Sequence, residues 1–154
     1  KVYCDINIRP PFFSDETILF ALENANILKI SDEELPLVTL QLFGKNVVCA
    51  DAYDLIAQNY PKIKLILITQ GEMGSTCYDC QNKKIYTCKA EPVTAVSTVG
   101  AGDSYGATFL TQYLKANDIM LSMALASKVS AFVVSHQEAI PNDTKEFIKS
   151  VVPT

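Results

Sequence analysis

A short glycine-rich segment in the last third of the sequence has the residue types of an anion-binding site. Gly100, Ala101 and Gly102 carry no bulky side chains, so a ligand could approach their backbone closely. A helical pattern follows, and the first turn of a helix offers unpaired N–H groups and a partial positive charge. Asp103, within that turn, could accept a proton from an attacking hydroxyl group. The segment predicts a site for a transferring phosphoryl group with a base beside it.

Three other interpretations of this segment compete with that one. Asp103 could be a first-turn acid that only complements the helix dipole. Gly100, Gly102 and Gly106 read G-x-G-x-x-x-G, one residue longer than the dinucleotide fingerprint, and the acid expected about 20 residues later is absent. A P-loop requires a lysine after its second glycine, and the sequence has no G-x-x-x-x-G-K. From the spacing alone, a phosphoryl site and a plain helix start explain the segment equally well.

The composition is that of a globular protein without a nucleic-acid or membrane partner. The chain has 154 residues, of which 49% are hydrophobic and 19% charged, enough for a single domain over residues 1–154 with a sizeable core. The formal net charge of -4 argues against nucleic acid and against anionic membranes, since both attract basic surfaces. No run of about 18 apolar residues predicts a membrane span.

The cysteines favour reduced thiols and a cytoplasmic protein. An odd number of them is scattered through apolar surroundings: Cys4, Cys49, Cys77, Cys80 and Cys88. The C-x-x-C pair lies in an alternating, strand-like stretch, whereas a redox pair normally opens a helix. A zinc site would need a second pair, and the one histidine, His136, is far away in sequence. Buried or hairpin thiols are therefore favoured over a metal or redox site.

The surrounding elements alternate between strands and helices. The run 63–69 is nearly all apolar, as expected of a strand covered on both faces, and Pro10 and Pro11 end an earlier strand. Ser14 reads as a helix N-cap, and Ser31 with Glu34 has the spacing of a capping box. We expect strands at residues 1–6, 26–30, 63–69, 75–78 and 84–88, the last two as a hairpin. We expect helices from Ser14 to residue 24, from Ser31 onward, at 46–60 with Val48 on the apolar side, at 102–115, at 119–135 and after Asn142 or Asp143. This order predicts an α/β fold with helices on both faces of the sheet.

The segment from Thr98 through Asp103 to Ala107 closely resembles the second signature of the PfkB/ribokinase family of sugar kinases. Other segments match in the right order. Residues 5–9 resemble the D-x-N-x-R of fructokinase-like and ketodeoxygluconate-kinase-like members, and residues 26–34 resemble the family's A-D-I-L-K-x-N-x-x-E stretch. Residues 67–74 resemble its V-T-x-G-x-x-G stretch, and residues 126–141 resemble the late helix and loop that line the adenine pocket. The resemblance covers nearly the whole chain. It implies a three-layer, ribokinase-like sheet of the Rossmann-like kind.

The resemblance also implies roles for individual residues. Asp103 would be the catalytic base, and the backbone N–H groups of Gly100, Ala101 and Gly102 would form the anion hole for the γ-phosphoryl group. The other implied sites are Glu34 for Mg²⁺ through water, Thr69, Gly71, Gly74 and Thr98 for the nucleotide, Ser127 for the adenine pocket, and Asn7 and Arg9 near the sugar or phosphate end of the site. ATP and Mg²⁺ are the implied cofactors. Glu34 could also serve the capping box, and both of its roles can hold at once. Plain strand-end polarity would account for Asn7 and Arg9 equally well.

Three positions depart from the family pattern. Ser97 stands where many members have an aspartate that supports a monovalent-cation site, which leaves K⁺ dependence open. Ser31 replaces the asparagine of N-x-x-E, and Glu138 replaces a glycine near the nucleotide pocket. Such departures would suit a non-catalytic nucleotide-binding domain, whereas the retained Asp103 favours an enzyme.

Members of the family are considerably longer than this chain. The resemblance therefore implies a C-terminal portion that carries the ATP site and the base. The N-terminal half, with most sugar contacts and the lid that often forms a homodimer contact, would lie outside it. We expect an ATP-dependent, fructokinase-like sugar kinase, with 2-keto-3-deoxygluconate as the alternative substrate. The fragment alone is expected to be inactive or nearly so.

Overall fold

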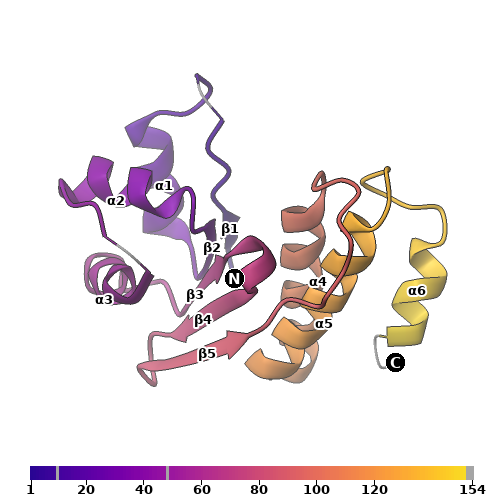
Figure 1. The fold of residues 1–154 in the computed structure, drawn as a ribbon. Coiled ribbons are helices and arrows are strands. Elements are labelled where there is room, and N and C mark those ends of the chain that lie inside the picture. Colours follow the sequence, from indigo (N-terminus) through magenta and orange to yellow (C-terminus); the bar gives the residue numbers. More distant parts are fainter. Residues whose placement is uncertain (10, 48, 152–154) are drawn as a thin grey trace. The chain divides into compact units, whose positions relative to one another are not determined.

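The computed structural model describes residues 1–9, 11–47 and 49–151 and divides the chain into two compact units (Figure 1). The first unit holds residues 1–70 and 76–86, and the second holds residues 71–75 and those from 87 onward. Two details of the sequence prediction fall outside the described residues. They are the strand stop at Pro10 and the apolar helix position at Val48.

Strands and helices alternate along the described chain, which confirms the α/β class. Five strands form one mixed sheet in the order β1-β2-β3-β4-β5 within the described residues. The strands are β1 (Tyr3–Asp5), β2 (Ile27–Ser31), β3 (Leu65–Thr69), β4 (Ser75–Asp79) and β5 (Lys84–Cys88). The helices are α1 (Asp15–Asn24), α2 (Leu35–Phe43), α3 (Cys49–Asn59), α4 (Ala101–Ala116), α5 (Ile119–Val134) and α6 (Thr144–Val151), with a 3-10 turn η1 (Gly71–Met73).

The strands β1, β2 and β3 run parallel, so their carboxyl ends meet at one edge of the sheet. In their register Asp5 lies opposite Lys29, and Ser31 lies opposite Thr69. Four of the five residues of β3 are buried, including Leu67 at 0% exposure. Strands of parallel sheets are apolar on both sides because both of their faces are covered. The nearly continuous apolar run at 63–69 is therefore explained.

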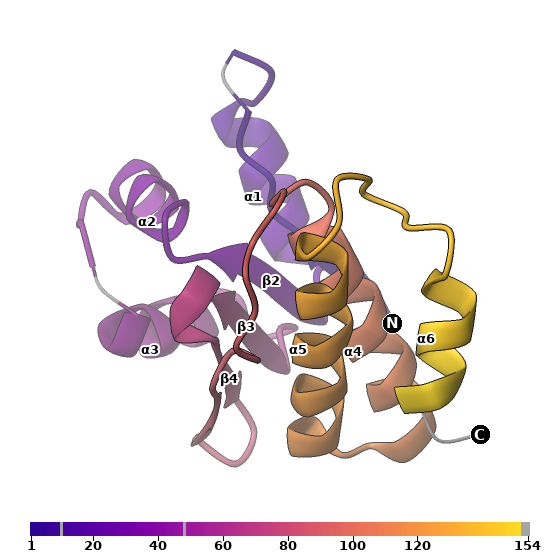
Figure 2. The same cartoon turned by 45° about the vertical axis from the view of Figure 1, so that its right-hand side comes forward.

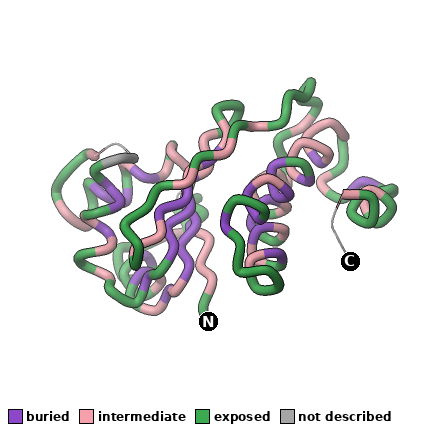
Figure 3. Tube along the Cα trace, turned by 90° about the horizontal axis from the view of Figure 1, so that it is seen from below, coloured by how far each residue is buried: buried purple, intermediate pink, exposed green. Residues whose placement is uncertain are grey.

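The core of the first unit lies between the sheet and α1, α2 and α3. Successive side chains of a strand point to opposite faces, and alternate residues of β2 and β3 join this core. The fully buried members include Leu22 of α1, Val38 of α2 and Ile56 of α3. Figure 3 shows the purple, buried stretches concentrated along these strands. The apolar periodicity of the helices is what brings them onto this face.

The predicted cap of α1 is confirmed, whereas α2 and α3 begin later than the sequence predicts. Ser14 caps α1 and accepts a hydrogen bond from the Thr17 amide at 3.3 Å. The prediction of a helix from Ser31 was wrong, because residues 32–34 form a turn and α2 begins at Leu35, with a proline in its first turn. The predicted start of α3 at residue 46 was also wrong, because the helix begins at Cys49.

The hairpin of β4 and β5 is confirmed. Its turn is held by Asp79, whose carboxylate accepts from the amides of Gln81 at 3.0 Å and Asn82 at 3.1 Å. Lys83 completes the turn with a left-handed φ of 52°. Asp side chains that bond their own backbone two residues on are characteristic of such turns.

In the second unit, α4 and α5 lie side by side (Figures 1 and 2). They are joined by Asn117, which is left-handed with φ 54°, and by Asp118, which caps α5 by accepting from the Leu121 amide at 2.9 Å. Phe109 of α4 and Met123 of α5 are fully buried. Small side chains on α5 permit this close packing, as predicted. No helix in the described part of the chain is long and apolar enough to cross a bilayer.

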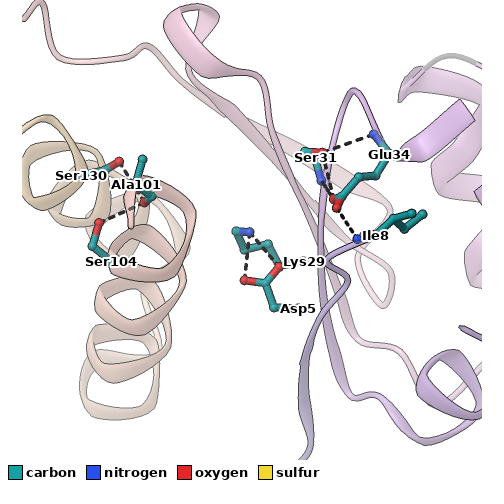
Figure 4. A network of polar contacts seen from close by, with 8 residues as sticks. All are labelled: Asp5, Ile8, Lys29, Ser31, Glu34, Ala101, Ser104 and Ser130. Carbon is teal, nitrogen blue, oxygen red and sulfur yellow. Dashed lines mark hydrogen bonds and ion pairs between the residues drawn. The ribbon is translucent and has the colours of Figure 1, made fainter. Parts of the chain in front are cut away.

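A buried ion pair joins β1 to β2 in the first unit (Figure 4). Lys29 Nζ lies 2.8 Å and 2.9 Å from the two carboxylate oxygens of Asp5, and the side chains are only 7% and 23% exposed. The Ile6 amide donates to the Lys29 carbonyl at 2.9 Å, directly beside the pair. The ion pair therefore fixes the end of β1, from which residues 7–9 lead on.

Replacing Lys29 with Met should lower the free energy of unfolding by about 3 kcal/mol, because it leaves the Asp5 carboxylate half-buried without its cation. The double variant Asp5→Leu/Lys29→Met should recover most of that loss, since no charge is then stranded. Denaturation in urea measures both values. Lys64→Met, at an exposed lysine, is the matched control. Equal stability of the single variant and the control would contradict the structural role of the pair.

Candidate functional site

The predicted anion site stands at the start of α4. Gly100 is the N-cap residue, with a left-handed φ of 81°, and the helix begins at Ala101. The Ser104 amide donates to the Gly100 carbonyl at 2.9 Å, and the Ala101 amide turns back to the Thr98 carbonyl at 3.2 Å. Among the described residues, no side chain caps the helix and no group accepts from the amides of Gly102 and Asp103. These donors therefore remain available to an anion.

Gly100 is required at this position for two reasons. Its positive φ is rarely adopted by residues with a side chain. A Cβ built on Gly100 would also lie 3.1 Å from Ala139 Cβ and 3.2 Å from the Ala139 carbonyl oxygen, so Ala139 would have to shift by a few tenths of an ångström. The start of α4 is thus packed directly against the loop that follows α5.

Two serines hold the first peptide of α4 in place (Figure 4). The carbonyl oxygen of Ala101 accepts from Ser104 Oγ at 3.0 Å and from Ser130 Oγ of α5 at 3.1 Å. Two hydrogen bonds to one carbonyl limit how far this peptide can rotate. The direction of the neighbouring N–H groups is consequently set by α5 as well as by α4 itself.

Asp103 is exposed in the first turn of α4. Its carboxylate makes no hydrogen bond or ion pair with the residues that the structure describes. A carboxylate that is open to solvent and lies beside free backbone donors can accept a proton from a hydroxyl group brought to it. The same position also complements the helix dipole, so both explanations from the sequence fit the geometry.

Glu34 has all of its hydrogen-bonding contacts inside the first unit (Figure 4). Its Oε2 accepts from the Ser31 amide at 3.1 Å and from Ser31 Oγ at 2.9 Å, while the Glu34 amide donates to Ser31 Oγ at 3.2 Å. This is the reciprocal capping box that the spacing predicts. Its Oε1 accepts from the Ile8 amide at 2.7 Å, a contact that the sequence did not indicate.

The Ile8 contact brings together the residues predicted for the sugar and for the metal. Asn7 and Arg9 flank Ile8 and are exposed, on the same short loop that Glu34 holds. Among the described residues, no group of three or more His, Cys, Asp or Glu side chains could hold a metal ion. Mg²⁺ commonly keeps several waters and binds through few carboxylates and substrate phosphates, so Glu34 fits an indirect, water-mediated role.

The residues predicted for the nucleotide phosphates lie at and after the end of β3. Thr69 is its last residue, and its carbonyl accepts from the Asp32 amide at 3.0 Å. Gly71 opens η1 with φ 53°, and a Cβ there would meet nothing within 4 Å. Gly74 has φ 102°, and a Cβ there would lie 2.1 Å from the Cys88 carbonyl oxygen and 2.8 Å from the Ala90 amide nitrogen. Gly74 therefore serves the packing of its turn against the end of β5.

Ser127 and Thr98 occupy different environments. Ser127 is 8% exposed, and its Oγ accepts from the Glu91 amide at 3.1 Å and donates to the Lys89 carbonyl at 3.4 Å. It ties residues 89–91 to α5, so any influence on a nucleotide would pass through that segment. Thr98 is exposed, and its carbonyl closes the turn before α4.

The site residues fall into one group in each unit. Asn7, Arg9, Glu34 and Thr69 belong to the first, and Gly71, Gly74, Thr98, Ser127 and the segment 100–103 belong to the second. Sequence reasoning missed Lys29, Ser130 and Ala139 as supports of these groups. The role of Lys29 could have been predicted, because it lies in the matched stretch 26–34 and its partner Asp5 lies in the matched stretch 5–9. Ser130 and Ala139 left no such signal, since small residues on a helix or loop usually indicate packing alone.

The cysteine prediction is confirmed for the residues that can be described. Cys4, Cys77, Cys80 and Cys88 are free thiols. Cys77 is fully buried in β4, and burial followed by the charge of Asp79 raises its pKa. The same two causes, in the same order, raise the pKa of Cys80 to about 11. A buried thiol with a raised pKa is a weak nucleophile, and the position of the pair in the hairpin fits the predicted structural role.

Comparison with known proteins places these features in a family. Residues 1–146 match the model of the pfkB family carbohydrate kinases. A fructokinase of Rhizobium leguminosarum bv. trifolii is 33% identical over 130 residues, which cover 80% of this chain and 36% of that protein. The chain spans about half the length, or less, of the curated relatives that it matches.

Solved structures agree on the fold. A fructokinase from Xylella fastidiosa with bound ATP superposes with a TM-score of 0.76 and 19% identity, covering 96% of this chain and 51% of that one. An E. coli chain described as a ribokinase II, solved in complex with ATP and Mg²⁺, has a TM-score of 0.72 and 18% identity over 88% of this chain and 42% of that one. These likenesses confirm the prediction of a ribokinase-like fold.

The thiol of Cys80 should react slowly with iodoacetamide at pH 8. Its raised pKa leaves little thiolate, so we expect a rate about 100-fold below that of glutathione, rising about tenfold per pH unit up to pH 10. Mass spectrometry of the peptide that contains Cys80 measures the rate. A rate equal to that of glutathione would point to an activated thiol and would contradict the structural assignment.

Proposed function

Because the chain belongs to the pfkB family of carbohydrate kinases, we propose that it carries the ATP side of a sugar kinase, with Asp103 as the base. The observation that carries the proposal is the start of α4, where an exposed carboxylate lies beside backbone donors that no described side chain caps. In the reaction, Asp103 takes the proton of the attacking hydroxyl group, whose oxygen bonds to the γ-phosphorus of ATP while the bond to the β-phosphate oxygen breaks.

The anion hole stabilises the charge that spreads over the transferring phosphoryl group. Backbone donors fixed in direction before the reaction are effective because no reorganisation is needed when charge develops. The amides of Gly100 and Gly102, and that of Ala101 once it leaves Thr98, are the donors that we assign. Gly102 and Asp103 already have amides without a partner among the described residues, which supports this assignment.

Mg²⁺ would neutralise the phosphate charge and orient the γ-phosphoryl group. We assign Glu34 to the water shell of the ion rather than to direct coordination, because its two carboxylate oxygens already accept three hydrogen bonds from the protein. Thr69, Gly71 and Thr98 are assigned to the nucleotide. Gly74 and Ser127 act by holding the segments beside them.

For the acceptor we propose a fructose-like ketose. The Rhizobium relative named as a fructokinase supports this choice, as do the exposed Asn7 and Arg9 on the loop held by Glu34. The alternative acceptor is 2-keto-3-deoxygluconate, whose carboxylate would pair with the Arg9 guanidinium. A screen of both substrates with the full-length protein distinguishes them, because Arg9→Gln should impair the keto acid far more than fructose.

Asp103→Asn should lower kcat by about 10²–10⁴-fold in the full-length protein and change the affinity for ATP by no more than about threefold, since only the base is lost. Coupled-enzyme kinetics and calorimetry measure the two quantities. Asp51→Asn, which alters an exposed acid in the first turn of α3, is the control. A loss below about tenfold would contradict the role of base, and ATP binding without turnover in the unmodified protein would favour a non-catalytic domain.

The 154-residue chain by itself should show little or no sugar-dependent conversion of ATP to ADP. We propose that the remainder of the kinase supplies most sugar contacts and the lid, and a site without its lid does not exclude water from the transferring group. A coupled ATPase assay with and without fructose is the measurement. Turnover equal to that of the full-length protein would overturn this proposal.

A further inference from the structure

The loop that follows α5 packs against the N-cap of the proposed anion hole. Ala139 occupies the space that a Cβ on Gly100 would need, at 3.1 Å from the Ala139 Cβ and 3.4 Å from its Cα. The contact involves the backbone of the loop as well as its side chain. Any shift of Ala139 toward α4 would therefore push on Gly100, and any shift away would leave Gly100 unsupported.

His136 closes the base of this loop. Its Nδ1 lies 2.7 Å from the Phe132 carbonyl oxygen, and since a carbonyl can only accept, Nδ1 carries the hydrogen. The other ring nitrogen, Nε2, lies 3.8 Å from Asp143 Oδ1 across the far end of the loop, and the two side chains form an ion pair when the ring is protonated. Residues 137–142 are thus bracketed between one histidine at the end of α5 and one aspartate at the start of α6.

The two helices that bear these ends are themselves joined. The ring of Phe132 stacks on Phe147 of α6, with centroids 4.1 Å apart and an interplanar angle of 6°, and its centroid lies 4.5 Å from that of His136. The Asp143 carbonyl accepts from the amides of Glu146 and Phe147, each at 3.0 Å. The loop therefore has two anchored ends rather than one.

The last turns of α5 also hold the chain that enters the anion hole. The Val134 carbonyl accepts from the amides of Val96 at 2.8 Å and Ser97 at 3.2 Å. Ser130, one turn earlier, bonds the Ala101 carbonyl. His136 thus lies between the end of α5, which holds residues 96–101, and the loop that contains Ala139.

We propose that His136 is a positioning residue of the anion hole and that Asp143 is its partner. Together they brace the loop whose Ala139 sets the N-cap of α4, and so they control the direction of the donor amides. The inference rests on the proposed kinase function. Neither side chain touches the reacting groups, so the expected effect is on kcat rather than on ATP affinity.

His136→Leu in the full-length protein should lower kcat about tenfold, because displaced donors stabilise the transition state less well. The KM for ATP should stay within about twofold, because the contacts that bind the nucleotide are unchanged. His136→Asn, which keeps a donor near the Nδ1 position, should recover most of the rate. Gln137→Ala, at an exposed position of the same loop, should match the unmodified protein. A folded His136→Leu with unchanged kcat would overturn the proposal.

Asp143→Asn is a second variant that should not impair folding, since the Asp143 side chain is 58% exposed. It should lower kcat about threefold in the same assay, because an uncharged amide cannot form the ion pair that the carboxylate makes with the protonated ring of His136. An unchanged rate in this variant would remove Asp143 from the proposal.

A readout without turnover separates this inference from the kinase assignment. The amide chemical shifts of Gly100 and Gly102 in the 154-residue chain should move in His136→Leu and remain unchanged in Gln137→Ala. If these shifts move but neither the unmodified full-length protein nor any variant phosphorylates a sugar, the kinase proposal fails, and the support of the Ala139 loop by His136 remains. If the shifts do not move, the positioning role of His136 is refuted whatever the activity.

Discussion

Among the described residues, no side chain pairs with the first backbone amides of α4, and the architecture of the second unit depends on that constraint. The helices α1 and α5 begin with Ser14 and Asp118, which cap them in the usual way. Gly100 offers no such side chain and adopts a left-handed conformation instead. Replacing a capping side chain by glycine costs a helix only a few tenths of a kcal/mol, so the free donors are kept at a small energetic cost.

The support that a cap would have given comes from α5. A hydroxyl from Ser130, a carbonyl from Val134 and the loop around Ala139 hold the entry to α4 from three directions. None of them occupies the Gly102 and Asp103 amides. Helix α5 thus positions the entry to α4 through Ser130 and Val134, and its small side chains let the two helices pack closely.

Elements determined by local signals could be predicted from the sequence, and those determined by distant contacts could not. The apolar run of β3, the Ser14 cap and the β4–β5 hairpin depend on neighbouring residues, and all are confirmed. The capping box of Ser31 and Glu34 forms, yet α2 starts only after it, because residues 32–34 close into a turn. The spacing alone does not distinguish a box that opens a helix from one that precedes it.

The same division applies to the candidate site. The segment 100–103 could be proposed as an anion site from local features, its residue types and its position before a helix, and the family resemblance favoured that interpretation over a plain helix start. The contact of Glu34 with the Ile8 amide joins two motifs that lie far apart in sequence, so no single motif indicated it. The role of Ala139 depends on a backbone approach, which leaves no trace in residue type.

The close approach at Gly74 has a consequence for genetics. Every amino acid reachable from a glycine codon by one nucleotide change carries a Cβ, and here that atom would collide with the Cys88 carbonyl. A mutational scan would therefore score Gly74 as intolerant throughout, as strongly as it would score a residue that touches ATP. Intolerance at Gly74 therefore reports the path of the main chain, and by itself it is not evidence that this residue touches a nucleotide.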